Sequence, residues 1–431
     1  RRLQHHRPSR KFRAVASNMD LPVSPLAPER FPVLPKVGGV ELTTHSLGLY
    51  KGKVRDDLLV VHFPQGASVG GIFTNSSTRS DDVDVCRAHL KAGGGRARVL
   101  VVNTGNSNAF TGAAGVAKNR ATIASAVKKS GCADHEVFVS ATGVIGEPLP
   151  AHIVSGGVET VWEKLGAPDW EKVANCIRTT DTFAKASGEI VNLNRRNVAI
   201  VGVAKGSGMI QPNMATTLNY MFTDANLGPK VCQALISKLG DLTYNCITVD
   251  SDTSTSDTLL FFATGAAGGE PIENPDDPRL AEFIEAMHRV LLDLATQIVR
   301  DGEGATKIIE ITVEGAASDA SAKTIACSIA NSPLVKTAIA AGDANWGRVV
   351  MAVGKTAEPV ERDRISLWFG DHLVAMDGAR AADYSEEKAT RSVSGQEVFI
   401  RVDVGVGRGK ARVWTCDLTD GYVKINGAYR S

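Results

Sequence analysis

Three short polar segments that contain glycine carry the residue types best suited to chemistry. They span residues 103–108, 140–146 and 205–208, and each follows an apolar, strand-like run. Glycine lets backbone N–H groups approach a ligand closely, and the ligand-binding groups of α/β proteins often lie where strands end in such turns. One such segment alone is typical of an ordinary turn. The three together indicate where we expect the chemistry.

The third segment continues to Thr216, which opens a strand-like run after a bend at Pro212. A hydroxyl held there could attack the carbonyl carbon of Ala215 and cut the chain. Cleavage would leave Thr216 with a free α-amine, whose unperturbed pKa is about 7.7–8.0. Such an amine is a general base near neutral pH, attached to the nucleophile that it activates. On these residues alone the simpler interpretation also stands, because threonine favours the start of a strand.

Other catalytic and metal-binding patterns fail on spacing. The glycines of residues 405–410 lie between two strand-like runs, whereas a dinucleotide fingerprint needs a strand and then a helix. Residues 250–254 resemble the start of a calcium loop, but Thr255 and Phe261 occupy the positions that need glycine and glutamate. The nine histidines do not cluster. We therefore expect no metal site.

The run from Lys205 to Thr216 (KGSGMIQPNMAT) closely resembles the autocleavage motif of one enzyme family. That family is the arginine-biosynthesis ornithine acetyltransferases, or bifunctional glutamate N-acetyltransferases. The resemblance extends from about Phe31 to the C-terminus. Six further segments resemble the family in its order, at residues 103–108, 140–146, 179–182, 300–307, 342–348 and 422–426.

The resemblance implies a role for each matching residue. Thr216 is the expected nucleophile and, after cleavage between Ala215 and Thr216, the N-terminus of a second chain. The Thr142 hydroxyl and the Gly143 N–H are the expected oxyanion hole, since acyl transfer needs donors aimed at the developing alkoxide. The residues expected to bind substrate are Thr182, Lys205, Thr216, Glu303, Asn426 and Ser431.

The charges of these residues suit an amino-acid substrate. Lys205 complements a carboxylate and Glu303 complements an ammonium group. The simpler alternatives are a surface ion pair for the two charges and a frayed end for Ser431. Two departures from the family also appear: Thr217 replaces a bulkier apolar residue and competes with Thr216 as the cut site, and the chain ends in Ser431 instead of threonine. The spacing from Lys205 favours Thr216.

The implied reaction is a double displacement. The Thr216 hydroxyl attacks the acetyl carbonyl of N2-acetylornithine, ornithine leaves, and glutamate takes the acetyl group from the acetyl-Thr216 ester. We expect no metal or organic cofactor, with acetyl-CoA as a second candidate donor. One rival interpretation is an N-terminal-nucleophile amidase or aminopeptidase of related fold, in which water takes the acyl group. The other is a non-catalytic binding scaffold, which predicts an uncut chain.

Strands and helices must alternate to position these residues, so the predicted class is α/β. A helix over 113–130 should stop at Gly131, and one over 278–300 should begin after Asp277. The run 398–406, the turn 407–409 and the run 410–416 predict a β-hairpin. The resemblance adds an αββα-type sandwich and a smaller domain near the C-terminus. The other predicted strands are 98–103, 136–140, 197–203, 258–264, 307–314, 348–353 and 365–369.

Composition excludes several classes of protein. The 431 residues are 43% hydrophobic and 22% charged, which is typical of a globular protein of two or three domains. The net charge of +1 gives no long-range attraction for nucleic acid or an anionic membrane, and no apolar run is long enough to span a bilayer. Seven scattered cysteines without a C-x-x-C pair predict reduced, mostly buried thiols.

The N-terminal stretch is basic and differs from the rest of the chain. Residues 1–19 contain six Lys or Arg residues and no acidic residue, which is typical of an organelle transit peptide; a disordered basic tail is the alternative. We expect a plastid stroma more than a mitochondrial matrix. The predicted division is a leader over 1–28, an alpha chain over 29–215 and a beta chain over 216–431, and the resemblance implies an assembly of two copies of each cleaved chain.

Overall fold

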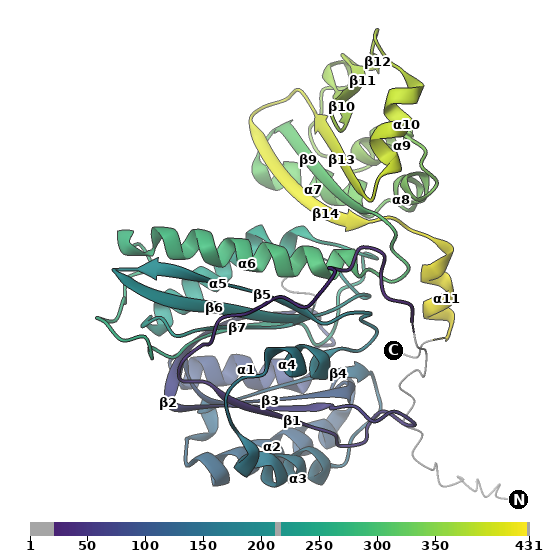
Figure 1. Ribbon diagram of the computed structural model, residues 1–431. Helices are drawn as coiled ribbons and strands as arrows, with labels where there is room; N and C mark the ends of the chain where they lie inside the picture. Colours follow the sequence, from purple (N-terminus) through teal and green to yellow (C-terminus); the bar gives the residue numbers. More distant parts are fainter. Residues whose placement is uncertain (1–20, 212–216, 429–431) are drawn as a thin grey trace, which may run out of the picture.

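The computed structural model describes residues 21–211 and 217–428 and contains two β-sheets (Figure 1). The larger sheet has the strand order β4-β3-β2-β8-β7-β6-β5, with β1 paired to β2. Its strands are β1 (Glu41–His45), β2 (Leu58–Phe73), β3 (Arg96–Asn106), β4 (Val137–Val144), β5 (Lys185–Leu193), β6 (Arg196–Lys205), β7 (Leu218–Thr223) and β8 (Thr258–Ala263). Its helices are α1 (Asp81–Ala92), α2 (Gly112–Ser130), α3 (Ala151–Val161), α4 (Trp170–Ile177), α5 (Pro229–Leu242) and α6 (Ala281–Arg300).

The larger sheet is folded into two layers by the long strand β2. The first part of β2 pairs with β1 and β3, its register shifts between His62 and Ala67, and its last part pairs with β8. Helices α2 and α3 lie outside the β1–β4 layer, and α5 and α6 lie outside the β5–β8 layer (Figure 1). This arrangement confirms the predicted αββα sandwich. Helix α4 contacts strands of both layers.

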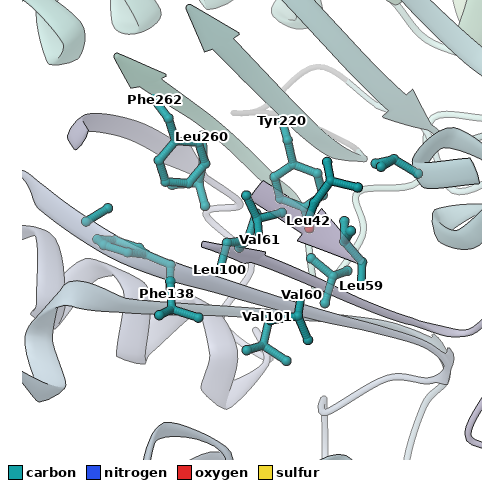
Figure 2. Packing of buried hydrophobic residues seen from close by; sticks show 14 of the residues in the cluster. Leu42, Leu59, Val60, Val61, Leu100, Val101, Phe138, Tyr220, Leu260 and Phe262 are labelled. Carbon is teal, nitrogen blue, oxygen red and sulfur yellow. The ribbon is translucent and has the colours of Figure 1, made fainter. Parts of the chain in front are cut away.

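Apolar side chains from both layers fill the space between them. Figure 2 shows Tyr220 and Phe262 of the β5–β8 layer directed toward Val61 and Leu100 of the other layer. Alternate residues such as Phe261 lie in a second cluster under α5 and α6. Because side chains alternate between the two faces of a strand, strands that are apolar on both faces are buried on both sides.

The two predicted helices form where their end signals lie. Helix α2 ends at Gly131, whose φ of 71° is the left-handed conformation that glycine adopts without strain. A short turn begins at Pro278 and leads into α6. The Asp277 side chain caps this turn by accepting a hydrogen bond from the Arg279 N–H. The expected apolar stripe of the helix is fully buried, at Phe283, Met287, Val290, Leu291, Leu294 and Ile298.

The smaller sheet forms the predicted second domain and has its own apolar core. Its strand order is β12-β11-β10-β13-β9-β14. Helix α6 contacts β14, which joins the two parts. The strands are β9 (Ile308–Ala316), β10 (Ser366–Phe369), β11 (His372–Met376), β12 (Ala379–Arg380), β13 (Glu397–Asp403) and β14 (Gly409–Cys416). The helices that follow β9 are α7 (Asp319–Ala330), α8 (Pro333–Ala340), α9 (Trp346–Gly354), α10 (Glu386–Ser394) and α11 (Asp420–Ala428).

The predicted hairpin over 398–416 is wrong. Strands β13 and β14 do not pair with each other, because β9 lies between them. Strand β13 pairs with β9 in parallel and β14 pairs with it antiparallel. The second predicted strand, 410–416, matches β14 to within one residue, whereas the first, 398–406, extends three residues past the end of β13. A glycine turn between two strands does not fix their neighbours when a third strand supplies a longer ladder.

The predicted strand over 348–353 is also wrong, because these residues form most of α9. The Asn345 side chain accepts a hydrogen bond from the Arg348 N–H and caps the helix. Val349, Ala352 and Val353 are buried at helical spacing, so tertiary packing outweighs the β-propensity of the valines.

All seven cysteines are free and only Cys327 is partly exposed, which confirms the predicted thiols. Burial raises the pKa of Cys416 to about 11 and of Cys86 to about 12. No helix of the described ranges has the length and apolar character needed to cross a membrane.

Candidate active site

One cavity brings together five of the residues expected to do chemistry. Its volume is about 360 Å³, and it lies where β4 and β6 end and β7 begins. Helix α11, from the end of the chain, contributes Asn426 to the cavity wall. The five expected residues in the lining are Thr142, Gly143, Lys205, Glu303 and Asn426.

The expected oxyanion hole lies at the end of β4. Gly143 pairs with Gly105 of β3 in parallel register. Its φ is 137°, and a Cβ there would lie 2.6 Å from the Asn106 nitrogen, so only glycine fits. Thr142 and Gly143 both line the cavity, and no hydrogen bond of the Thr142 hydroxyl to another described residue is present.

Thr216 and Ser431 lie outside the described residues, as does Ala215. Thr217, which follows Thr216 in the chain, lines the cavity and is buried. Its carbonyl accepts a hydrogen bond from the Thr258 N–H of β8, 2.8 Å away, and its hydroxyl accepts one from Asn219. The described part of the cavity wall thus includes Thr217, the residue that follows the expected nucleophile in the sequence.

Lys205 ends β6 and presents a cation to the cavity. Among the described residues its ammonium has no hydrogen bond and no ion pair, although Asp181, Asp257 and Glu303 lie close enough to interact electrostatically. Burial lowers the pKa of Lys205, and Asp181 is the carboxylate that opposes this most strongly. A half-buried cation without a direct partner among the described residues favours an anionic ligand.

Glu303 and Asn426 form a hydrogen-bonded pair in the lining of the same cavity. Asn426 Nδ2 donates to Glu303 Oε2 at 2.6 Å. Glu303 is buried, which raises its carboxyl pKa, and the hydrogen bond from Asn426 opposes the shift. The cavity thus offers one positive and one negative group, as expected for an amino-acid ligand.

Thr182 lies beside this cavity and not in its lining. It lines a neighbouring apolar cavity, also about 360 Å³, that shares Thr180 and Glu303 with the first. The Thr182 hydroxyl donates to Asp301 Oδ1 at 2.5 Å and accepts from the Ser24 N–H at 2.9 Å. Its observed partners are therefore the chain's own groups.

A buried ionic network supports both cavities. Lys185 Nζ lies 2.8 Å from Asp181 and 2.5 Å from Asp301, and all three side chains are fully buried. Burial opposes ionisation of Asp181, but the Lys185 ammonium lowers its pKa below the usual range. Asp181 also accepts a hydrogen bond from the Gly206 N–H, the residue after Lys205. The network therefore fixes the segment that carries Lys205.

The sequence analysis missed the segment 250–257, which lines the same cavity. Asp250 accepts hydrogen bonds from the N–H groups of Met209 and Ile210 and from the Tyr422 hydroxyl. Burial raises the pKa of Asp250, and the two backbone hydrogen bonds oppose this. The sequence signal for this segment is its run of acidic and hydroxyl residues before β8, whose failure to match a calcium loop does not exclude a place in the cavity wall. No group of three or more metal-ligating side chains occurs in the part of the chain that the structure describes.

Comparison with known proteins identifies the family. A model described as the ArgJ family matches residues 41–431. The arginine biosynthesis bifunctional protein ArgJ of Rhizobium meliloti is 52% identical over 412 residues, covering 95% of this chain and 99% of that protein. The protein of that name from Mesorhizobium japonicum is 52% identical over 421 residues, covering 96% and 100%. The crystal structure of ArgJ from Bacillus halodurans matches with a TM-score of 0.46 and 42% identity, over 48% of this chain and 96% of that one.

The matches to the Rhizobium meliloti and Mesorhizobium japonicum proteins span nearly the whole of both chains, so the similarity is not confined to one domain. The chain belongs to the ArgJ family, which confirms the resemblance seen in its motifs and the predicted class of enzyme, an acyltransferase of arginine biosynthesis.

Proposed function

We propose that the enzyme moves the acetyl group of N2-acetylornithine to glutamate through an acetyl ester on Thr216. The observation that carries the proposal is the cavity that joins Thr142 and Gly143 to Lys205 and Glu303. These residues come from three separate parts of the chain. A hydrogen-bond donor pair beside one cation and one anion is suited to an acyl group attached to an amino acid.

The acyl-transfer half of the site would work through fixed donors. The Thr216 hydroxyl attacks the acetyl carbonyl and gives its proton to the α-amine of the same residue. The carbonyl oxygen becomes an alkoxide, which the Thr142 hydroxyl and the Gly143 N–H stabilise. Because the β3–β4 ladder holds Gly143 in place before the reaction, little reorganisation is needed when the charge develops.

The binding half of the site would hold the substrate's charged groups. Lys205 is proposed to bind the α-carboxylate that both acetylornithine and glutamate carry. Glu303, held by Asn426, is proposed to bind the ammonium group. Thr182 is proposed to act from the adjacent cavity by fixing Asp301, and Ser431 to complete the site from the C-terminus. We propose no metal or organic cofactor, with acetyl-CoA as a second candidate donor.

Self-cleavage comes first in this proposal. It would give an alpha chain over 29–215 and a beta chain that begins at Thr216, assembled as two copies of each. Intact mass under denaturing conditions, beside Thr216→Ala, tests it. Two fragments, the second beginning at Thr216, are expected from the wild type and one chain from the variant; a single chain in both samples would favour the binding scaffold.

Transfer itself is tested with N2-acetylornithine, with and without glutamate. Ornithine and acetylglutamate should appear together, at a rate that depends on glutamate. Rapid acetate release that ignores glutamate would instead support the amidase or aminopeptidase. Replacing acetylornithine by acetyl-CoA in the same assay tests the second donor, and a sedimentation measurement on the cleaved protein tests the α2β2 assembly.

The organelle location rests on the composition of residues 1–19, and the relatives named above are bacterial, so they give it no support. We propose the basic stretch as a transit peptide on that composition alone. A fluorescent fusion of residues 1–28 should enter plastids. A fusion that stays outside every organelle would overturn this part of the proposal.

A further inference from the structure

Asp257 is a buried carboxyl group in the cavity that the roles above leave unused. It lines the cavity together with Thr142, Gly143 and Lys205. The residue is only 1% exposed, and its Oδ2 has no hydrogen-bond partner among the described residues. Leaving a buried carboxyl oxygen without a partner is costly, so such an atom at a cavity wall indicates a ligand atom that completes it.

The other carboxyl groups in the described lining are already satisfied. Glu303 accepts a hydrogen bond from Asn426. Asp250 accepts hydrogen bonds from two backbone N–H groups and the Tyr422 hydroxyl. Asp252 is exposed to solvent. Asp257 is therefore the carboxyl of the described cavity wall that combines full burial with an unused oxygen.

The sheet places Asp257 level with Thr217, which lines the same cavity. Strands β7 and β8 are parallel, with Leu218 opposite Thr258. The Thr258 N–H donates to the Thr217 carbonyl, so Asp257 lies at the level of Thr217, one residue after Thr216. The Asp257 carbonyl accepts a hydrogen bond from the Thr74 N–H at 3.0 Å, which fixes its backbone. The acetyl oxygen is proposed to bind Thr142 and Gly143 in the same cavity, so the nitrogen attached to the acetyl carbon would also lie in the cavity that Asp257 lines.

We propose that Asp257 is the general acid–base group for the substrate's amino nitrogen, an inference that rests on the proposed acetyl transfer. In the first half-reaction the acetyl C–N bond breaks, its electron pair stays on nitrogen, and the Asp257 carboxylic acid supplies the proton. Ornithine leaves as an amine, Asp257 is left as a carboxylate, and the Thr216 amine holds the hydroxyl proton.

The second half-reaction restores both groups. Glutamate enters as an ammonium ion and must lose two protons to become an amide. One proton goes to the Asp257 carboxylate and the other to water. The nitrogen electron pair forms the new C–N bond, the ester C–O bond breaks, and its electron pair stays on Thr216 Oγ, which takes back the proton held by the Thr216 amine.

The surroundings of Asp257 favour the form that begins this cycle. Burial raises the pKa of Asp257 well above its usual range, and the opposing effects of Ser254 and Lys205 are smaller. A raised pKa favours the carboxylic acid, which is the form that donates to the leaving amine. It also makes the carboxylate a stronger base toward glutamate.

Two acetyl donors separate this role from a structural one. The amine that leaves from N2-acetylornithine needs a proton, whereas the phenolate that leaves from 4-nitrophenyl acetate does not. Asp257→Asn keeps the shape but cannot exchange the proton. We expect it to slow ornithine release by about 10²–10⁴-fold while the nitrophenolate burst stays within about threefold of wild type. Equal losses with both donors, or none with either, would overturn the proposal.

Controls give each outcome one meaning. Thr142→Val should slow both donors together, because the oxyanion forms with each of them. Asp276→Asn, on an exposed turn beyond the far end of β8, should change the rate with neither donor.

If wild-type enzyme releases no ornithine from acetylornithine, the proposed function itself fails. If mass analysis shows that Asp257→Asn stays uncut, Asp257→Ser, which also lacks the carboxyl proton, is measured instead. It should show the same split between donors, and equal losses would again overturn the proposal.

Discussion

Asn426 Nδ2 lies 2.6 Å from Glu303 Oε2, which ties the last helix of the chain to the segment that follows α6. The two residues are 123 positions apart in sequence. Glu303 is held on its other side by a hydrogen bond from its own N–H to the Ser207 carbonyl, two residues after Lys205. The C-terminal helix therefore helps to close a site whose other walls come from the larger sheet.

Glu303→Gln tests the charge at this contact. The variant keeps the size of the side chain and an oxygen for Asn426 but removes the negative charge. We expect the KM for N2-acetylornithine to rise about 10- to 100-fold with a smaller change in kcat, since a hydrogen bond to a charged group contributes about 1.5–3 kcal/mol. Steady-state kinetics measure both constants. A fall in kcat at constant KM would contradict the binding role.

The pH dependence of ornithine binding should reflect the titration of the two charged groups of the cavity, Glu303 and Lys205. Burial raises the pKa of Glu303 and lowers the pKa of Lys205. Binding needs the carboxylate of one and the ammonium of the other. Affinity should therefore fall as pH decreases through the raised pKa of Glu303, and also as pH increases through the lowered pKa of Lys205. The pH range of tight binding is then narrower than it would be for a Glu and a Lys with ordinary pKa values. Calorimetric titration across pH measures it.

Lys205→Arg is the control for the predicted loss of affinity at high pH. A guanidinium stays protonated at every pH of interest, so any loss of affinity that Lys205 causes should move to higher pH in the variant. If the variant loses affinity at the same high pH as the wild type, the titrating group is the ligand's own amine.

Gly143→Ala should disrupt the oxyanion hole. The added Cβ meets the backbone of Gly105 and Asn106 at 2.6 Å, at a φ that an L-residue rarely adopts. Displacing the 143 N–H should lower kcat by about 10²–10³-fold. Gly156→Ala is the matched control, since open space surrounds that position on α3, and its activity should be unchanged. Equal activities of the two variants would remove Gly143 from the mechanism.

Lys185→Met should unfold at a much lower temperature than the wild type. It leaves the carboxylates of Asp181 and Asp301 buried without their shared cation, a loss of about 3–5 kcal/mol in the free energy of unfolding. Arg391→Ala removes the exposed ion pair with Glu387 and should leave the melting temperature unchanged. Thermal unfolding of both variants compares a buried network with a surface pair, and similar melting temperatures would contradict the argument.

Thr182→Val separates support of the site from contact with substrate. The variant removes the hydroxyl that donates to Asp301, so the free energy of unfolding should fall by about 1–3 kcal/mol. The KM for N2-acetylornithine should change less than in Glu303→Gln, because Thr182 lies outside the lining of the main cavity. A larger rise in KM than Glu303→Gln gives would place Thr182 on the substrate.

The sequence by itself determined the elements whose signals are local. The end of α2 at Gly131 and the buried stripe of α6 follow from one backbone conformation and one helical period. The ordered motifs likewise predicted site roles for five residues that the structure brings to one cavity, because each motif is a short run of residues; they are Thr142, Gly143, Lys205, Glu303 and Asn426. Residues 348–353 show the limit, since the same β-branched run fits a strand or a helix until packing selects α9.

Only the tertiary structure decided which distant segments meet. Strand β9 lies between β13 and β14 because it forms backbone hydrogen bonds with both of them, and no local feature of the 398–416 region predicts that pairing. The sequence does not indicate a role for Asp257 for the same reason. Its carboxyl reaches the cavity only because the parallel pairing of β7 with β8 places it beside Thr217. Local conformation depends on neighbours in sequence, whereas the site depends on burial and pairing between residues hundreds of positions apart.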